Sequence, residues 1–261
     1  MKRHSALDYA YAIGRVRALE NFLVGRTAFE EAAEAADVSS ALRTLGEAGR
    51  FSEDFPDIRT SVQLDRVIER EEADLSSFLS EVILDKPVLE VFRRDSDPQE
   101  ALGLGRELGC PFIADYLRRR IDLGNIKVFL RARYLELPEE RFRAVVLRGG
   151  FLEERLFLDN YGLPFSEFGA RLSSTPYAGL WESSVRALGE RETFIDLERA
   201  SEDFLMAHLR RARYTVFGPD PVYAYGLAKK KELFLIRMVV SGKIHGIPAS
   251  VLKERISETY V

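Results

Sequence analysis

Residues 218–261, GPDPVYAYGLAKKKELFLIRMVVSGKIHGIPASVLKERISETYV, decide the fold of this chain. Pro221 stands where the first turn of a helix tolerates proline, because the N–H groups there have no partner inside the helix. Apolar residues then recur at helical spacing and predict one apolar face; they are Leu227, Leu233, Phe234, Met238 and Ile244. Gly242, Gly246 and Pro248 predict the end of this helix and the start of a shorter one. Such a helical hairpin needs other helices to cover its apolar face.

Helical periodicity continues through the rest of the chain. We expect long helices over 5–24, 63–82, 111–137 and 194–214, with short helices between them. Asp37 or Ser39 is expected to cap one of the short helices, and Asp97 another, with Pro98 in the first turn after it. No segment shows sustained alternation of apolar and polar residues between turn signals, the pattern of a strand. The predicted fold class is all-α.

Composition is that of an ordinary globular protein. The 261 residues are 46% hydrophobic and 31% charged, with a formal net charge of −4. An acidic balance argues against general nucleic-acid affinity. Cys110 is the single cysteine, which excludes a disulfide framework and a cysteine-based metal site. No run approaches the roughly twenty apolar residues of a membrane span, and Asp8 follows the basic start too soon for a signal peptide. We expect a cytoplasmic protein, and if it works at a membrane it does so through a partner.

An internal repeat relates residues 117–138 to residues 227–248 at an offset of 110 (227 − 117). Apolar, charged and helix-breaking positions agree in kind; the matched pairs are Leu117 with Leu227, Asp122 with Glu232, Leu123 with Leu233, Ile126 with Ile236, Lys127 with Arg237, and Pro138 with Pro248. A weaker third copy begins near Leu7. This period is too long for a solenoid unit, so it predicts duplicated, interlocked helical modules. We place the first over 1–137 and the second, with the closing helices, over 138–261.

Catalytic motifs are missing from the sequence. His4, His208 and His245 are far apart and have no neighbour at metal-ligand spacing. Gly242-Lys243 lacks the remaining residues of a phosphate-binding loop. Acidic pairs such as Glu71-Glu72 are expected on solvated helix faces. We therefore expect no catalytic residue, no metal and no cofactor.

Two basic triplets stand out in the repeat: Arg118, Arg119 and Arg120 in the first copy, and Lys229, Lys230 and Lys231 in the second. At the offset of 110, Arg119 and Arg120 match Lys229 and Lys230. One interpretation is a solvated helix edge, with i,i+3 ion pairs to Asp122 and Glu232 worth a few tenths of a kcal/mol each, about what such pairs contribute on helices. The other is a charged rim beside an apolar docking surface, because the triplets flank the apolar stripe. Under the second interpretation these six residues bind a partner.

The C-terminal sequence GPDPVYAYGLAKKKE and the internal DLGNIKVFLRA at 122–132 resemble the C subunit of the V-type/A-type ATP synthases, whose eukaryotic relative is the d subunit of the vacuolar proton pump. Tyr11 to Ala18 is similar to the family's opening segment, and the resemblance covers most of the chain. Typical members are longer and carry three related modules in a funnel with pseudo-threefold symmetry. The shorter chain implies two complete modules in a truncated funnel, with the deficit between Phe51 and Leu64.

This resemblance implies a mechanical role without catalysis. The family's subunit lies on the cytoplasmic face of the membrane proteolipid ring and holds the end of the rotor shaft, so that it couples the ATP-handling head to ion transport. Its partners would be the shaft subunits and the ring. The alternative is a free-standing helical adaptor, or a nucleic-acid binder that uses the basic triplets. Steep loss of affinity with salt would identify the nucleic-acid binder.

Overall fold

The computed structural model describes residues 4–94 and 97–261, with backbone alone at residue 107. Helices are the regular elements of this described part, which contains no strand, so the all-α prediction is confirmed. The chain forms two compact units: unit 1 comprises Met1–Phe92 with Met206–Val261, and unit 2 comprises Arg93–Leu205. The two units are defined by which residues lie close together in space. The predicted repeat modules, 1–137 and 138–261, remain a separate prediction.

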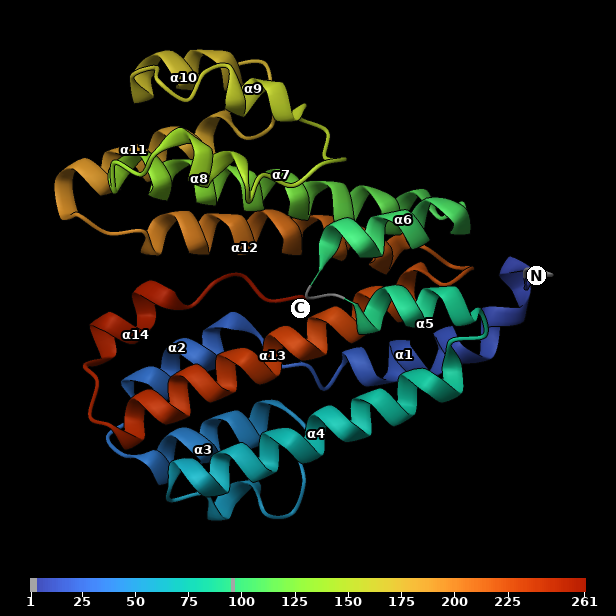
Figure 1. The fold of residues 1–261 in the computed structure, drawn as a ribbon. Coiled ribbons are helices and arrows are strands. Elements are labelled where there is room, and N and C mark those ends of the chain that lie inside the picture. Colours follow the sequence, from blue (N-terminus) through green and yellow to red (C-terminus); the bar gives the residue numbers. More distant parts are fainter. Residues whose placement is uncertain (1–3, 95–96) are drawn as a thin grey trace. The chain divides into compact units, whose positions relative to one another are not determined.

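Unit 1 is organised around one central helix, α13 (Figure 1). Its elements are η1 (Ala6–Tyr9), α1 (Ala10–Glu20), α2 (Arg26–Glu34), α3 (Val38–Ala48), η2 (Phe55–Asp57), α4 (Ser61–Val82), α5 (Lys86–Arg93), the end of α12 (Ile195–Arg210), η3 (Arg211–Tyr214), α13 (Asp220–Ile244) and α14 (Ala249–Arg255). Helix α13 packs against α1, α2, α3 and α4. Four helices of unit 1 therefore pack against this one helix.

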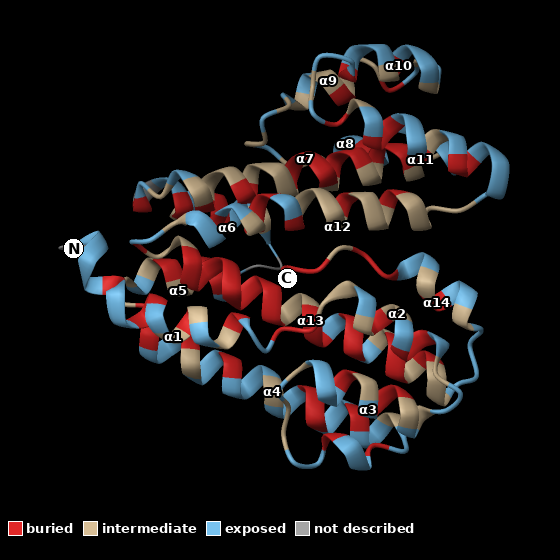
Figure 2. Cartoon of the chain, turned by 180° about the vertical axis from the view of Figure 1, so that it is seen from behind, coloured by how far each residue is buried: buried red, intermediate tan, exposed pale blue. Residues whose placement is uncertain are grey.

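Burial of α13 extends around almost its whole circumference, and Figure 2 shows it buried along most of its length. The predicted single apolar face is wrong in one respect: Phe234 is 57% exposed, whereas Tyr223 and Val239, outside the predicted stripe, are fully buried. A helix that is apolar on every side is one that neighbours surround. The core of unit 1 joins Leu233 and Ile236 to apolar residues of α2, α3 and α4.

Of the two glycines predicted to end α13, Gly246 does so and Gly242 does not. Gly242 lies inside the helix, which continues to Ile244, and the left-handed residue is Gly246 with φ 68°. A Cβ at Gly242 would lie 2.4 Å from Leu252 Cδ2, so glycine at this position permits α14 to approach. Gly246 is the residue whose positive φ ends the helix. Glycine at 242 serves packing, not termination.

Unit 2 is built from α6 (Pro98–Leu108), α7 (Pro111–Tyr134), α8 (Glu139–Arg143), α9 (Glu154–Leu158), α10 (Phe165–Leu172), α11 (Ala178–Arg191) and most of α12. The predicted N-cap Asp97 accepts hydrogen bonds from the N–H groups of Gln99 and Glu100. An aromatic cluster fills the core. The Phe129 ring stacks on the Phe168 ring with 4.1 Å between ring centres, and its centre lies 5.9 Å from that of Trp181. Such rings bury large apolar areas and fix the short helices α8–α11 around α7.

The two hairpins of the repeat end with the same backbone geometry. Glu136 and Gly246, at the 110-residue offset, both have positive φ (52° and 68°), and Pro138 and Pro248 are the N-caps of α8 and α14. The N–H of Leu137 donates to the carbonyl of Ala132 at 2.8 Å, as the matched pair Ile247 and Gly242 does at 2.8 Å. These features support the repeat, which stays a prediction until the two segments are superposed.

Candidate partner-binding surfaces

The arginine triplet lies half-buried on α7 in unit 2. The Arg118 Nη2 donates to the carbonyl of Gly150 at 3.3 Å, and its guanidinium lies 4.2 Å from the centre of the Phe151 ring. The Arg119 guanidinium lies 5.4 Å from the centres of both the Phe151 and the Phe204 rings, and the Arg120 guanidinium lies 6.0 Å from the centre of the Tyr116 ring. Guanidinium groups stacked on rings are held in place, so these cations are oriented before any partner arrives.

The lysine triplet on α13 in unit 1 divides into one buried and two half-buried side chains. Lys230 Nζ lies 4.0 Å from the Phe92 ring and donates to the Phe92 carbonyl at 3.4 Å. Lys231 Nζ lies 4.8 Å from the exposed Phe234 ring. Lys229 is 9% exposed. The predicted charged rim therefore does not describe Lys229, whose ammonium group points into the unit.

A buried ionic cluster surrounds Lys229. Its Nζ lies 2.5 Å from Glu232 Oε2, 3.8 Å from Glu71 Oε2 and 4.8 Å from the Phe51 ring. We call Glu71, Lys229 and Glu232 the Lys229 cluster. The second Glu232 oxygen accepts the N–H of Val24 at 2.7 Å. The cluster thus joins α13, α4 and the connections before α2 and after α3.

The structure contradicts one of the two interpretations of the Glu232 pair and the expectation for Glu71. Glu232 is 3% exposed, so its i,i+3 pair with Lys229 is buried rather than solvated. Glu71 was expected on a solvated face, yet its side chain is 11% exposed and accepts the N–H of Ser52 at 2.9 Å. Burial raises the pKa of Glu232, and the neighbouring Lys229 opposes this rise. A buried charge is retained where a partner and hydrogen bonds compensate it.

Asp122 occupies the matched position in unit 2 and is fully buried, not paired on a helix edge. It accepts three hydrogen bonds: from the N–H of Phe151 at 3.1 Å, from the N–H of Leu152 at 2.9 Å, and from the Tyr177 hydroxyl at 2.7 Å. Burial raises the pKa of Asp122, and these three donors oppose the rise. Because the Arg118 and Arg119 guanidiniums lie over the Phe151 ring, the bond from Phe151 to Asp122 helps to position these two arginines.

Asn125 contributes a second anchor in unit 2, for which the sequence predicted no structural role. Its amide donates to the carbonyl of Leu147 at 2.9 Å and accepts the N–H of Leu147 at 2.8 Å. The pair of bonds closes the 145–152 segment onto α7, beside Asp122. The sequence signal was the polar pair at 122 and 125 on an otherwise apolar stretch of helix.

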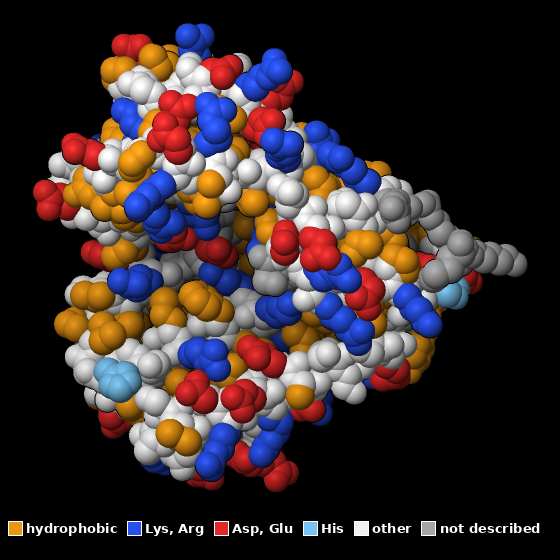
Figure 3. Space-filling view, viewed as in Figure 1, with side chains coloured by type: hydrophobic (Ala, Val, Ile, Leu, Met, Phe, Trp, Pro, Cys, Tyr) orange, Lys and Arg blue, Asp and Glu red, His pale blue; other side chains and the backbone are white. Residues whose placement is uncertain are grey.

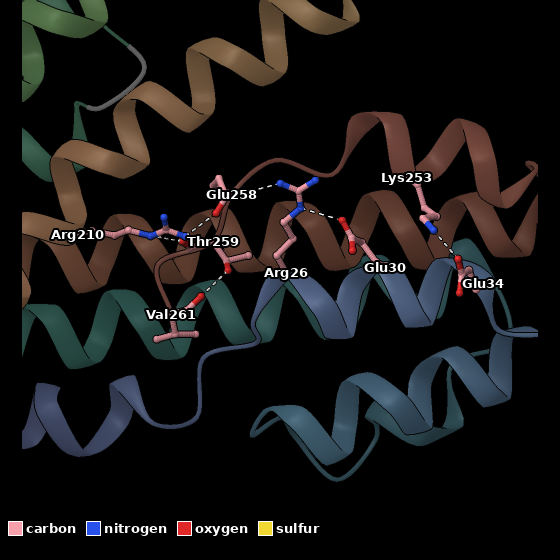
Figure 4. Close-up of polar contacts among 8 residues, drawn as sticks. All are labelled: Arg26, Glu30, Glu34, Arg210, Lys253, Glu258, Thr259 and Val261. Carbon is pink, nitrogen blue, oxygen red and sulfur yellow. Dashed lines mark hydrogen bonds and ion pairs between the residues drawn. The ribbon is translucent and has the colours of Figure 1, made fainter.

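An extended C-terminal strap, residues 256–261, crosses unit 1 after α14 (Figure 4). Glu258 binds Arg26 Nη1 at 2.6 Å and Arg210 Nη2 at 2.8 Å. Arg210 Nε also donates to the Thr259 carbonyl at 2.8 Å. Hydrogen bonds from these two arginines lower the pKa of Glu258. Ile256 and Tyr260 are buried, so the strap belongs to the core of the unit.

Asp220, in the first turn of α13, is half-buried, and this burial raises the pKa of its carboxyl to about 6. Between pH 4 and pH 6 the folded protein then holds a proton that the unfolded chain has released, so stability falls as pH rises through this window. Asp220→Asn should abolish this contribution to the pH dependence. We expect the fall in the free energy of unfolding across the window to be about 2 kcal/mol smaller in the variant, a value reduced for partial solvent exposure. Urea unfolding from pH 4 to pH 8 measures it. A parallel pH profile for the two proteins would show that Asp220 ionises normally.

Metal ligands do not gather in the part of the chain that the structure describes. Over 4–94 and 97–261, no group of three or more His, Cys, Asp or Glu side chains is placed to hold a metal ion. None of the helices described here is both long and apolar enough to cross a membrane. The Lys229 cluster, Asp122 and Glu258 instead connect helices and loops of the chain to one another, as charged residues of a helical scaffold do.

Comparison with known proteins identifies the family of this scaffold. The ATP synthase (C/AC39) subunit family matches residues 30–255, so the chain belongs to that family. The elements from α3 to α14, in both units, lie within the match, which begins inside α2. The family resemblance found in the sequence is confirmed.

Curated relatives agree with this assignment. The C subunit of the V-type sodium ATPase of Enterococcus hirae is 26% identical over 157 residues, which are 60% of this chain and 47% of that protein. The C subunit of the A-type ATP synthase of Halobacterium salinarum is 24% identical over 236 residues, covering 85% of this chain and 67% of the relative. The corresponding protein of Thermococcus kodakarensis is 26% identical over 192 residues, covering 71% and 48%. The chain thus spans about half to two thirds of the length of the relatives it matches.

Proposed function

We propose that this protein is a central-stalk coupling subunit of a rotary V/A-type ATPase, linking the rotor shaft to the membrane proteolipid ring on the cytoplasmic face. The observation that carries the proposal is the family match over residues 30–255. Membership of a family of ATP synthase subunits supports the prediction that the chain has no catalytic role of its own. Under this proposal it is held at the membrane through partner subunits.

The packing of both units supports a mechanical role. In unit 1 a single buried helix, α13, contacts four other helices, and the Lys229 cluster cross-links it to α4 and to two connections. In unit 2 Asp122 ties the 150–152 segment and the N-cap of α11 to α7 through buried hydrogen bonds. Close-packed interiors transmit strain, which a subunit under torque requires.

The nucleic-acid alternative is less well supported by these observations. Lys229 is buried, and the remaining triplet side chains are half-buried, so neither triplet forms a fully exposed basic strip. On the face that Figure 3 shows, Lys and Arg side chains are interspersed with Asp and Glu. A nucleic-acid surface requires clustered cations.

Co-purification tests the proposed function. We would tag the chain in its native cell, solubilise the membranes in mild detergent and identify what is retained. We expect the ATP-handling head, the shaft and the proteolipid ring to be recovered together with the chain. Recovery of the intact rotary ATPase from the same cells without the tagged chain would contradict the proposal.

Charge reversal tests the predicted partner-binding residues. We expect Arg119→Glu, Arg120→Glu and Lys230→Glu together to slow association with reconstituted shaft or ring by roughly tenfold, because rim charges act mainly on association rate. Lys229 is left unchanged because of its burial. The measurement is association kinetics at two salt concentrations, with the thermal midpoint of each protein.

A matched control carries the same change in charge elsewhere: Arg43→Glu, Arg66→Glu and Arg171→Glu, at exposed arginines. This variant should associate at the wild-type rate. Equal slowing in both variants would show that net charge alone matters, and that the triplets are not the binding residues.

A further inference from the structure

One end of unit 1 carries an exposed apolar patch that the proposed function does not use. Tyr214 is 89% exposed, and four more large apolar side chains of two neighbouring segments are exposed by about half or more; they are Leu7, Tyr11, Val216 and Phe217. We call these five residues the aromatic end patch. We propose that this patch binds directly to the surface of a lipid bilayer that contains anionic lipids.

The two segments of the patch are fastened together. The N–H of Gly218 donates to the carbonyl of Ala6 at 3.1 Å. Arg17 Nη2 donates to the carbonyls of Ala212 and Thr215 at 2.8 and 2.9 Å. The 212–218 segment is therefore fixed beside η1 and α1. An exposed apolar surface that is held in one shape marks an interaction site more strongly than scattered apolar residues do.

Charges beside the patch favour an anionic surface. Arg211 and Arg213 are exposed within the same segment as Tyr214. Arg15 lies 5.7 Å from the Tyr11 ring, although its charge is paired with Glu81.

Two carboxylates, Asp8 and Asp220, also lie close to these segments in the sequence. Asp8 accepts the N–H of Ser5 at 2.7 Å as part of a helix cap. Asp220 is half-buried, so it is less available to a bilayer surface than the exposed Arg211 and Arg213 are. The two exposed arginines of the 211–217 segment therefore complement the negative potential of a bilayer rich in anionic lipid.

A bilayer fits the patch better than an acidic protein does. Tyrosine rings join an apolar body to a polar tip, and arginine stems are apolar up to the guanidinium, which matches the change from headgroup to acyl chain at a membrane surface. The segment from Arg211 to Phe217 places two arginines and one tyrosine next to Val216 and Phe217, on a 3₁₀ turn and the loop that follows it. Binding through such a segment combines apolar insertion with attraction to anionic lipid.

This inference goes beyond the proposed function, in which partner subunits make the membrane contact. It also stands apart from it, because the patch would bind vesicles in the absence of every other subunit. Failure of vesicle binding leaves the co-purification result untouched, and failure of co-purification leaves vesicle binding to be measured. The two outcomes are therefore distinguishable.

Vesicle co-sedimentation of the purified full chain tests the proposal. Vesicles of phosphatidylcholine with 30% phosphatidylserine are compared with vesicles of phosphatidylcholine alone, an anionic fraction of about the order found in cytoplasmic leaflets. We expect clear binding to the anionic vesicles and roughly tenfold weaker binding to the neutral ones. Tyr214→Ser, Val216→Ser and Phe217→Ser together should weaken binding to anionic vesicles at least tenfold, on the order expected for removing three inserted side chains.

The control variant makes the same kind of change at equally exposed apolar residues outside the patch: Leu135→Ser, Val62→Ser and Phe234→Ser. It should bind as the wild type does. A second variant, Arg211→Gln with Arg213→Gln, keeps the apolar patch and should lose roughly tenfold on anionic vesicles alone. The proposal is overturned if the wild type does not bind anionic vesicles, if it binds an acidic protein but no vesicle, or if the patch and control variants bind equally.

Discussion

Replacing Lys229 by methionine should lower the free energy of unfolding by about 3–5 kcal/mol, the cost of removing one member of a buried ion pair. The change leaves Glu232, 3% exposed, without its cation, and removes the ammonium from Glu71 as well. Methionine keeps most of the side-chain volume, so a cavity contributes little. Denaturation in urea at pH 7 gives the value.

Lys230→Met is the control, because it removes the neighbouring charge from a half-buried site. Its contact with the Phe92 ring predicts a loss of about 0.5–1 kcal/mol. Adding Glu232→Gln to Lys229→Met should restore part of the loss, since the uncompensated charge is then gone. Equal losses for the two lysines would mean that the Lys229 cluster is solvated, and that α13 is not held as described.

Asp122→Ala should destabilise unit 2 by about 3–5 kcal/mol, because each buried donor left without a partner costs roughly 1–3 kcal/mol. The donors are the N–H groups of Phe151 and Leu152 and the Tyr177 hydroxyl. Amide hydrogen exchange should accelerate most at Phe151 and Leu152, since these two bonds are lost directly. The free energy of unfolding and the exchange rates are measured on the same protein.

Tyr177→Phe is the matched control for Asp122, because it removes one of the three donors and leaves the carboxylate; a loss of about 1 kcal/mol is expected. Gly150→Ala should disturb the same hydrogen bonds by displacing the carboxylate, since the added Cβ would lie 2.0 Å from Asp122 Oδ1. It should resemble Asp122→Ala. Wild-type stability in both Asp122→Ala and Gly150→Ala would show that the 150–152 segment is not anchored by this carboxylate.

Local signals in the sequence were sufficient for the helices and their caps. The N-cap role of Asp97 and the proline-bearing start of α13 are confirmed, and of the two expected caps Asp37 and Ser39 the N-cap is Asp37. Each of these features depends on residues within one helical turn. Gly242 was wrongly counted among the residues that end α13. Glycine can end a helix but also allows another element to approach closely, and the residue that approaches, Leu252, lies in another helix.

Burial of the charged residues was beyond what helical spacing can predict. Lys229 and Glu232 were correctly recognised as an i,i+3 pair, but the groups that surround them, Glu71 and the Val24 N–H, are far away in sequence. Asp122 is similar, since its partner Tyr177 is 55 residues distant. Tertiary packing decided whether each charge was solvated, and the 110-residue match between Asp122 and Glu232 was the available sign of a shared structural role.

The most direct test of the coupling role is ATP-driven ion transport in membrane vesicles from cells that lack this chain. Transport and ATP hydrolysis are measured in the same vesicles, before and after purified protein is added back. We expect ion transport to be lost while the ATP-handling head continues to hydrolyse ATP, and the purified chain to restore transport. Full ion transport in its absence, coupled to hydrolysis as in wild-type vesicles, would contradict the coupling role.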